Sequence, residues 1–157
     1  MRFCALDPGK SGALAIIDDE GVWAVPLPFN GDELDIGELA NHFIGEPCFV
    51  ALEKVHAMPK QGVCSVWTFA QGYGELRGML KTLSVPFVEP TPQAWKKLIL
   101  AGMDWKGRKE CSIEYVAKRY PQVDLKPGKK RVPHDGMADA ICLAEYAKRI
   151  YLTSNSK

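Results

Sequence analysis

Four carboxylate side chains stand where the chain could bring them together around a metal ion. Asp7 ends the first apolar run, and Glu53 follows the apolar residues 48–52. Asp135 and Asp139 are four residues apart in the last predicted helix, so they share one helix face. Ionised carboxylates about 4 Å apart repel by about 1–4 kcal/mol, which a hard divalent cation offsets. Two magnesium ions held in this way support hydrolysis of a phosphodiester.

Each of these acids also has an ordinary structural explanation. An aspartate before Pro-Gly commonly forms a turn, and a glutamate at a strand end is commonly just solvated. An aspartate in the first turn of a helix stabilises the helix dipole. Whether the four acids converge depends on the elements that carry them.

The apolar pattern predicts one α/β domain over residues 1–157, with helices on the faces of a mixed sheet. Short turns between the first three strands indicate an antiparallel meander, and helical connections then add two parallel strands. The predicted strands are residues 2–7, 13–17, 22–25, 48–52 and 85–88. The predicted helices are residues 32–44, 62–83, 92–101, 106–119 and 133–151.

Composition excludes several classes of protein. The 157 residues are 46% apolar and 25% charged, which excludes a disordered or fibrous chain. No apolar run reaches the roughly 18–20 residues of a membrane span, and Asp7 interrupts any signal-peptide core. We therefore predict a cytoplasmic protein with no membrane partner. The five cysteines lack C-x-x-C spacing, which favours buried thiols in a reducing compartment over disulfides or zinc.

Charge is distributed unevenly along the chain. Residues 1–53 hold 2 basic and 10 acidic side chains, whereas residues 96–131 hold 11 basic and 4 acidic ones. Such a basic stretch indicates a polyanion partner, although a solvated helical face has the same composition. We interpret its side chains as contacts to the phosphate backbone of a nucleic acid. The predicted contacts are Lys96, Lys97, Lys106, Arg108, Lys109, Lys129, Lys130 and Arg131.

The run Gly9-Lys10-Ser11 is similar to the end of a nucleotide-binding P-loop but does not complete one. A P-loop also needs a glycine at the position where this chain has Cys4, and it must open a helix. Here an apolar strand follows instead. The glycines are better explained by a tight turn between two strands.

Four motifs occur in a characteristic order. They are Leu6-Asp7-Pro8-Gly9 with Gly12-Ala13-Leu14-Ala15, then Ala51-Leu52-Glu53-Lys54-Val55, then the glycine-spaced residues 72–78, and finally His134-Asp135-Gly136-Met137-Ala138-Asp139-Ala140. Together they resemble the RuvC-type Holliday junction resolvases, especially phage-type members. The resemblance covers about residues 2–150 and implies an RNase H-like fold.

The resemblance implies a homodimeric, magnesium-dependent endonuclease that cuts four-way DNA junctions by two symmetrical nicks. Asp7, Glu53, Asp135 and Asp139 would hold two Mg²⁺ ions per active site, with Mn²⁺ as a substitute. His134 would assist proton transfer or contact the phosphate.

The fourth active-site group is assigned between two neighbours. Many bacterial members place it three residues before the final aspartate, where this chain has Gly136. Asp135 lies four residues before Asp139, and His134 lies five before it. We favour Asp135, because residues i and i+4 share a helix face and a carboxylate suits magnesium better than an imidazole.

Two further segments are interpreted through the same resemblance. Many members carry an aromatic wedge after the second acidic residue, where this chain reads His56-Ala57-Met58-Pro59. We interpret this stretch as an ordinary loop, with His56 or Met58 as the alternative wedge. The helix at 62–83 holds four glycines, each costing about 1 kcal/mol relative to alanine, which indicates a close helix contact. We predict that this helix forms the homodimer interface, with core packing as the alternative.

Other functions use the same acids. One is a different RNase H-like nuclease, acting on RNA–DNA hybrids or branched DNA, and another is a catalytically inert junction-binding module. An actin-like ATPase also has an early aspartate and glycines, but 157 residues are too few for its two lobes. Cleavage of a four-way junction indicates the resolvase, and cleavage of a hybrid alone indicates the other nuclease. Junction binding without any cleavage indicates the inert module.

Overall fold

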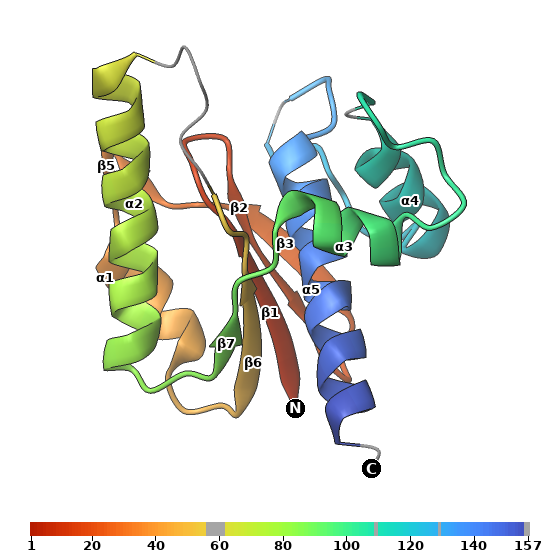
Figure 1. Ribbon diagram of the computed structural model, residues 1–157, viewed down its shortest axis with the longest axis horizontal. Coiled ribbons are helices and arrows are strands. Elements are labelled where there is room, and N and C mark those ends of the chain that lie inside the picture. Colours follow the sequence, from red (N-terminus) through yellow and green to blue (C-terminus); the bar gives the residue numbers. More distant parts are fainter. Residues whose placement is uncertain (56–61, 109, 129, 156–157) are drawn as a thin grey trace.

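A five-stranded mixed sheet forms the centre of the molecule (Figure 1). The structure is a computed structural model that describes residues 1–55, 62–108, 110–128 and 130–155. The strands lie in the order β3-β2-β1-β6-β7. Their bounds are β1 Arg2–Asp7, β2 Ala13–Ile17, β3 Val22–Pro26, β6 Cys48–Leu52 and β7 Phe87–Val88. The first three strands pair antiparallel, and β6 and β7 add parallel to β1, which confirms the predicted sheet.

Helices cover both faces of this sheet. Helices α3, α4 and α5 pack on one face, and α1 and α2 pack on the other. Their bounds are α1 Ile36–Ala40, followed by a 3₁₀ turn at Asn41–Phe43, then α2 Val63–Thr82, α3 Pro92–Ile99, α4 Cys111–Arg119 and α5 Asp135–Ser154. None of the helices in the described ranges is both long and apolar enough to cross a membrane.

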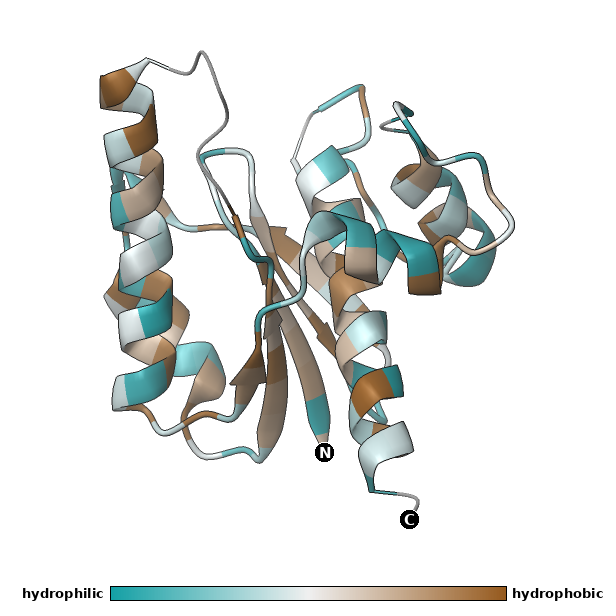
Figure 2. Ribbon diagram, viewed as in Figure 1, coloured by the Kyte–Doolittle hydropathy of each residue, from teal (hydrophilic) through white to brown (hydrophobic). Residues whose placement is uncertain are grey.

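Alternation along the strands builds two separate hydrophobic cores. Phe3 and Ala5 of β1 contribute to the core beneath α5, whereas Cys4 and Leu6 contribute to the core beneath α2. Figure 2 shows the apolar colouring running along the strands between the two helical layers. Residues of odd number near the end of β1 therefore face α5.

The prediction of one helix over residues 32–44 is wrong. A small hairpin of β4 (Phe29–Asn30) and β5 (Glu33–Leu34) occupies the first part, and α1 begins only at Ile36. The side chain of Asp35 accepts a hydrogen bond from the Glu38 amide at 2.9 Å, which fixes the helix start there. The apolar residues of β5 and of the short helix α1 happen to follow one helical spacing, which is why the sequence predicts a single helix there.

The predicted helix over residues 106–119 also begins later than expected. Gly107 has a φ of +75°, which ends helical geometry before α4, and α4 begins at Cys111. The Cys111 thiol bonds to the Asp104 carbonyl at 3.4 Å and holds this loop against the helix. The sequence predicts that Lys106 and Arg108 open a helix. In the structure they lie in the loop before α4 instead.

Candidate active site

Strand pairing places Asp7 beside Glu53. In the parallel pair β1–β6, Leu6 lies opposite Leu52, and the Glu53 amide continues the ladder by donating to the Leu6 carbonyl at 3.0 Å. Both acidic residues follow the alternation that turns Ala5 and Ala51 toward α5. The two carboxylates therefore stand at the same edge of the sheet and on the same face.

Two glycines bring the start of α5 onto this edge. A Cβ atom on Gly136 would lie 2.0 Å from the Ser11 carbonyl oxygen, and one on Gly12 would lie 1.9 Å from the Asp7 carbonyl oxygen. No side chain fits at either position. The turn after β1 consequently packs directly against the first turn of α5, which carries Asp135.

The four predicted carboxylates form one electrostatic group. Burial raises the pKa of Asp7 well above its usual range, and the negative charges of Glu53, Asp139 and Asp135 raise this pKa further. The ammonium of Lys96 acts in the opposite direction. The structure thus brings together all four acids that the sequence singled out.

Neutral donors hold two of these acids. Burial raises the pKa of Glu53, while a hydrogen bond from Trp95 opposes the rise, with Nε1 2.8 Å from Oε1 of Glu53. Burial likewise raises the pKa of Asp139, and a hydrogen bond from Ser112 opposes it. Sequence reasoning missed Trp95 and Ser112, because a tryptophan or serine between apolar residues carries no sign that it touches an acid.

His134 has a structural task that the sequence did not predict. Its Nδ1 accepts a hydrogen bond from the Met137 amide at 3.2 Å and so caps α5. Burial and the nearby charge of Lys130 lower the pKa of His134, against the effect of Asp135. A neutral ring with Nδ1 as acceptor is the form that makes this cap.

The donor set fits a hard divalent cation by its chemistry. Carboxylate oxygens are the ligands that Mg²⁺ and Mn²⁺ prefer, and the mutual repulsion that raises the pKa of Asp7 is what a cation relieves. Within the described ranges, no three acidic, histidine or cysteine side chains are already arranged to hold an ion. Coordination therefore requires these side chains to adjust.

The predicted DNA-contact residues do not all lie in equivalent places. Lys96 is half-buried, with its ammonium 5.1 Å from the centre of the Trp95 ring, and its charge acts on Asp7, Glu53 and Asp139. It therefore belongs to the acidic site itself. Arg108 forms a 2.6 Å ion pair with Glu114.

The other predicted contacts that the structure describes are exposed. Figure 1 shows that the loop before α5 and the segment before α4 lie at the same end of the molecule as the start of α5. The exposed basic residues on α3 and in these two loops are Lys97, Lys106, Lys130 and Arg131. Lys109, Lys129 and both alternative wedge residues, His56 and Met58, lie outside the described residues.

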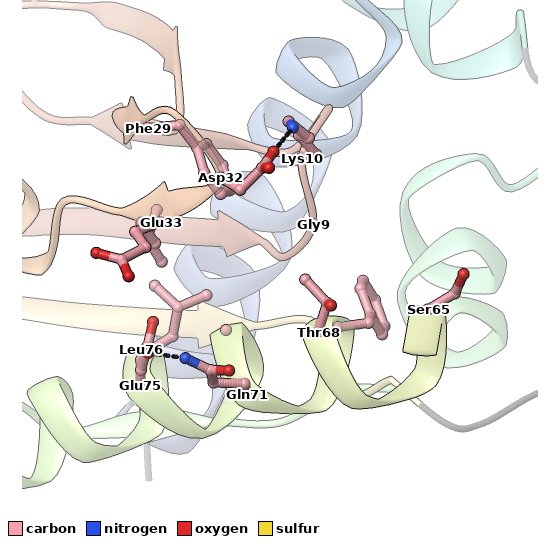
Figure 3. Close-up of a pocket in the computed structure, with 13 residues that line it drawn as sticks. Gly9, Lys10, Phe29, Asp32, Glu33, Ser65, Thr68, Gln71, Glu75 and Leu76 are labelled. Atoms are coloured by element: carbon pink, nitrogen blue, oxygen red, sulfur yellow. Dashed lines mark hydrogen bonds and ion pairs between the residues drawn. The ribbon is translucent and has the colours of Figure 1, made fainter. Parts of the chain in front are cut away.

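A groove of about 570 Å³ lies between α2, the turn after β1 and the β4–β5 hairpin (Figure 3). Lys10 pairs with Asp32 on one wall, and Gln71 bonds to Glu75 at 3.1 Å on the other. Glu33 adds a further negative charge, so the lining is acidic overall. None of the four site carboxylates lines this groove, and its charge does not favour a phosphate.

No family model matches the sequence, and no curated protein matches it. Solved structures do match. Thermus thermophilus RuvC in complex with a Holliday junction substrate has a TM-score of 0.61 at 15% identity, covering 99% of this chain and 97% of that one. A second Thermus thermophilus RuvC structure has a TM-score of 0.59 at 19% identity, and the match covers 96% of this chain and 97% of that one. The yeast mitochondrial Holliday junction resolvase has a TM-score of 0.53 at 13% identity, and the match covers 97% of this chain and 80% of that one. These likenesses confirm the predicted RNase H-like fold.

Proposed function

We propose that this chain is a metal-dependent endonuclease that resolves four-way DNA junctions. One observation carries the proposal: β1, β6 and α5 bring four carboxylates into a single group whose charges raise the pKa of Asp7. A fold shared with a RuvC structure solved on a Holliday junction substrate supports the choice of substrate.

In this proposal Asp7, Glu53, Asp135 and Asp139 hold Mg²⁺, two ions per site, with Mn²⁺ as a substitute. When bound, the metal would lower the pKa of a water and offset the charge on the departing 3′ oxygen, so the products would carry a 5′ phosphate and a 3′ hydroxyl. The chain supplies the rest of the environment. Its four carboxylates lie within electrostatic range of one another at the sheet edge, and Lys96 offers a positive charge beside them to a phosphate oxygen.

The DNA strand follows the basic end of the molecule. Lys106, Lys130 and Arg131 are exposed in the loops at the end of the molecule where α5 begins, and Lys97 is exposed on α3. These side chains can contact phosphates without reading sequence. Arg108 has to leave its ion pair with Glu114 to join them, and exposed pairs of this kind contribute little to stability. His134 keeps its second ring nitrogen for a proton or a phosphate contact.

A homodimer through α2 belongs to the same proposal. Val63 and Trp67 on the first half of α2 are 85% and 73% exposed, which is unusual for large apolar side chains. Cβ atoms on Gly72, Gly74 and Gly78 would meet nothing within 4 Å. Packing inside the chain therefore does not account for these glycines, and a second copy packed on α2 supplies the close contact.

The test is a gel assay with a labelled synthetic four-way junction, a linear duplex and an RNA–DNA hybrid, each with and without Mg²⁺. Paired nicks near the branch point, only on the junction and only with metal, are the expected result. Binding without cutting in Mg²⁺ or Mn²⁺ indicates the junction-binding module. If only the hybrid is cut, the assignment of the four acids stands, but the substrate is an RNA–DNA hybrid and not a four-way junction.

A further inference from the structure

We propose that Trp95 and Ser112 are positioning residues that hold Glu53 and Asp139 in the orientation that binds the metal. This inference rests on the proposed function, because it assigns those two acids to a metal site. Neither donor lies on an element that carries one of the four site acids: Trp95 belongs to α3 and Ser112 to α4.

Core packing around Trp95 and the cap of its helix both hold the Trp95 indole in place. Trp95 is fully buried in the core beneath α5, and Thr91 caps the first turn of α3 by accepting from the Ala94 amide at 3.2 Å. An indole has one donor and no acceptor, and here that donor points at Oε1 of Glu53, 2.8 Å away. A carboxylate accepts several hydrogen bonds, so Glu53 retains lone pairs on both oxygens for a further ligand.

Ser112 plays the corresponding part for Asp139. It lies in the first turn of α4 and is only 2% exposed, so its hydroxyl has no access to bulk water. Helix α4 packs against α5, which carries Asp139, and the Ser112 hydroxyl opposes the rise that burial causes in the pKa of Asp139 and of the Cys142 thiol, one turn further along α5. A serine hydroxyl has one hydrogen to donate and two lone pairs to accept with, so it can serve both neighbours.

The neutrality of the two donors is the reason to assign them this role. An arginine or lysine at either position would neutralise the acid and compete with a cation. An indole N–H or a hydroxyl restricts the side chain while leaving its full negative charge for the metal. Partners of this kind behind metal ligands are typically worth 10–100-fold in metal affinity or activity.

The first experiment compares Trp95→Phe with Trp105→Phe. Both changes remove an indole N–H and keep an aromatic ring, and Trp105 packs against the same core. Mn²⁺ binding to the DNA-free protein is followed by electron paramagnetic resonance, beside thermal unfolding. We expect Trp95→Phe to weaken Mn²⁺ binding about 10-fold and Trp105→Phe to change it less than twofold. Equal Mn²⁺ affinities in the two variants would overturn the role of Trp95.

The second experiment compares Ser112→Ala with Ser112→Thr, which restores the hydroxyl. We expect about 10-fold weaker Mn²⁺ binding in the alanine variant and recovery of most of it in the threonine variant. Equal losses in both would overturn the role of the hydroxyl. This series also provides a test if Trp95→Phe does not fold.

Junction cleavage then separates the two proposals. In a cleaving enzyme, Trp95→Phe should raise the Mg²⁺ concentration for half-maximal rate and lower kcat, with KM for the junction unchanged. If the wild type cuts no junction but Mn²⁺ affinity follows the two donors, the proposed function fails and the positioning role stands. If the wild type cuts and Mn²⁺ affinity ignores both donors, the positioning role fails. Absence of Mn²⁺ binding by the wild type also overturns it.

Discussion

Helices α5 and α2 are both 20 residues long and lie on opposite faces of one sheet, yet the sheet holds them very differently (Figure 1). The buried residues of α5 run from Gly136 to Ala147, more than half of its length. The buried residues of α2 are Leu76, Met79 and Leu80, all in its second half. Figure 2 shows apolar residues at the other end of α2.

The difference shows two uses of one kind of element. Small side chains such as Ala138, Ala140 and Ala144 let α5 approach β1 and β2 along most of its length, so the backbone that carries its acids is held in place. The first half of α2 has no such support, and its exposed Val63 and Trp67 suit a partner better than a core. We infer that α5 is the rigid part that carries the chemistry and that α2 is the part that docks.

The largest expected effect comes from Asp7→Asn on the α5 face. Loss of this charge should reduce metal-dependent junction cleavage on the order of 10³-fold or more, because the proposed metal site loses a ligand. Junction binding, measured by gel shift in EDTA, should remain within about threefold.

The matched control is Glu33→Gln in the acidic groove on the α2 side. It removes a carboxylate as well, but one that does not belong to the site, so cleavage should stay near the wild-type rate. A similar loss in both variants would contradict the division between the two faces.

The next effect compares the same substitution in the two helices. Gly136→Ala in α5 should cost about 3 kcal/mol or more of the free energy of unfolding, because its Cβ atom meets the Ser11 carbonyl at 2.0 Å. Gly74→Ala in α2 should stabilise the monomer by about 0.5–1 kcal/mol, because its Cβ atom meets nothing within 4 Å. Denaturant unfolding at low protein concentration measures both. Changes of the same sign would break the comparison.

A smaller effect concerns pH, with opposite signs on the two faces. Burial and neighbouring acids raise the pKa of Asp7 in the folded state, so the native protein binds more protons than the unfolded chain. Without metal, its contribution to the free energy of unfolding is present below the ordinary aspartate pKa of about 3.9 and is lost as pH rises through the folded pKa. Asp7→Asn should therefore stabilise the metal-free protein at pH 7, on the order of 0.5–2 kcal/mol.

Glu89, which faces α2, should behave in the opposite way. Burial alone would raise the pKa of Glu89, but hydrogen bonds from Tyr73 and from Arg77, whose Nη2 lies 3.1 Å from Oε2, lower it. Its stabilising contribution is present above the ordinary glutamate pKa of about 4.3 and is lost as pH falls through the folded pKa. Glu89→Gln should destabilise the protein at pH 7. Unfolding curves in EDTA between pH 4 and 8 test both signs, and equal slopes in the two variants would refute the assignment.

The sequence predicted the sheet and the four acids because both follow from local patterns. Two-residue alternation in β1 and β6 and the i, i+4 spacing in α5 determine which way Asp7, Glu53 and Asp139 point once the strands pair. The partners of those acids could not be found in this way. Trp95 and Ser112 reach Glu53 and Asp139 only through the packing of α3 and α4, and no local period records that contact.

The errors in the predicted elements have the same cause. Residues 32–44 show apolar side chains at helical spacing, but the chain turns back after Pro28, where the Asp35 amide donates to the Pro28 carbonyl at 2.8 Å. Charge counted along the chain assigns Lys96 to a basic surface, whereas its effect on the acids depends on the packing of α3 against α5. In both cases, contacts between residues far apart in the sequence determine the structure, and local spacing does not reveal such contacts.

The smallest expected effect on folding is that of Trp67→Ser, and it sharpens the comparison most. Because Trp67 is 73% exposed in the single chain, its removal should change the free energy of unfolding of the monomer by no more than about 0.5 kcal/mol. If a second copy covers α2, the same change should weaken self-association by at least tenfold in sedimentation equilibrium, because buried tryptophans dominate interfaces. Leu152→Ser, which removes an exposed apolar side chain near the end of α5, is the control and should leave self-association unchanged. A wild-type protein that stays monomeric at high concentration, or equal weakening by both variants, would mean that the exposed half of α2 has some other partner.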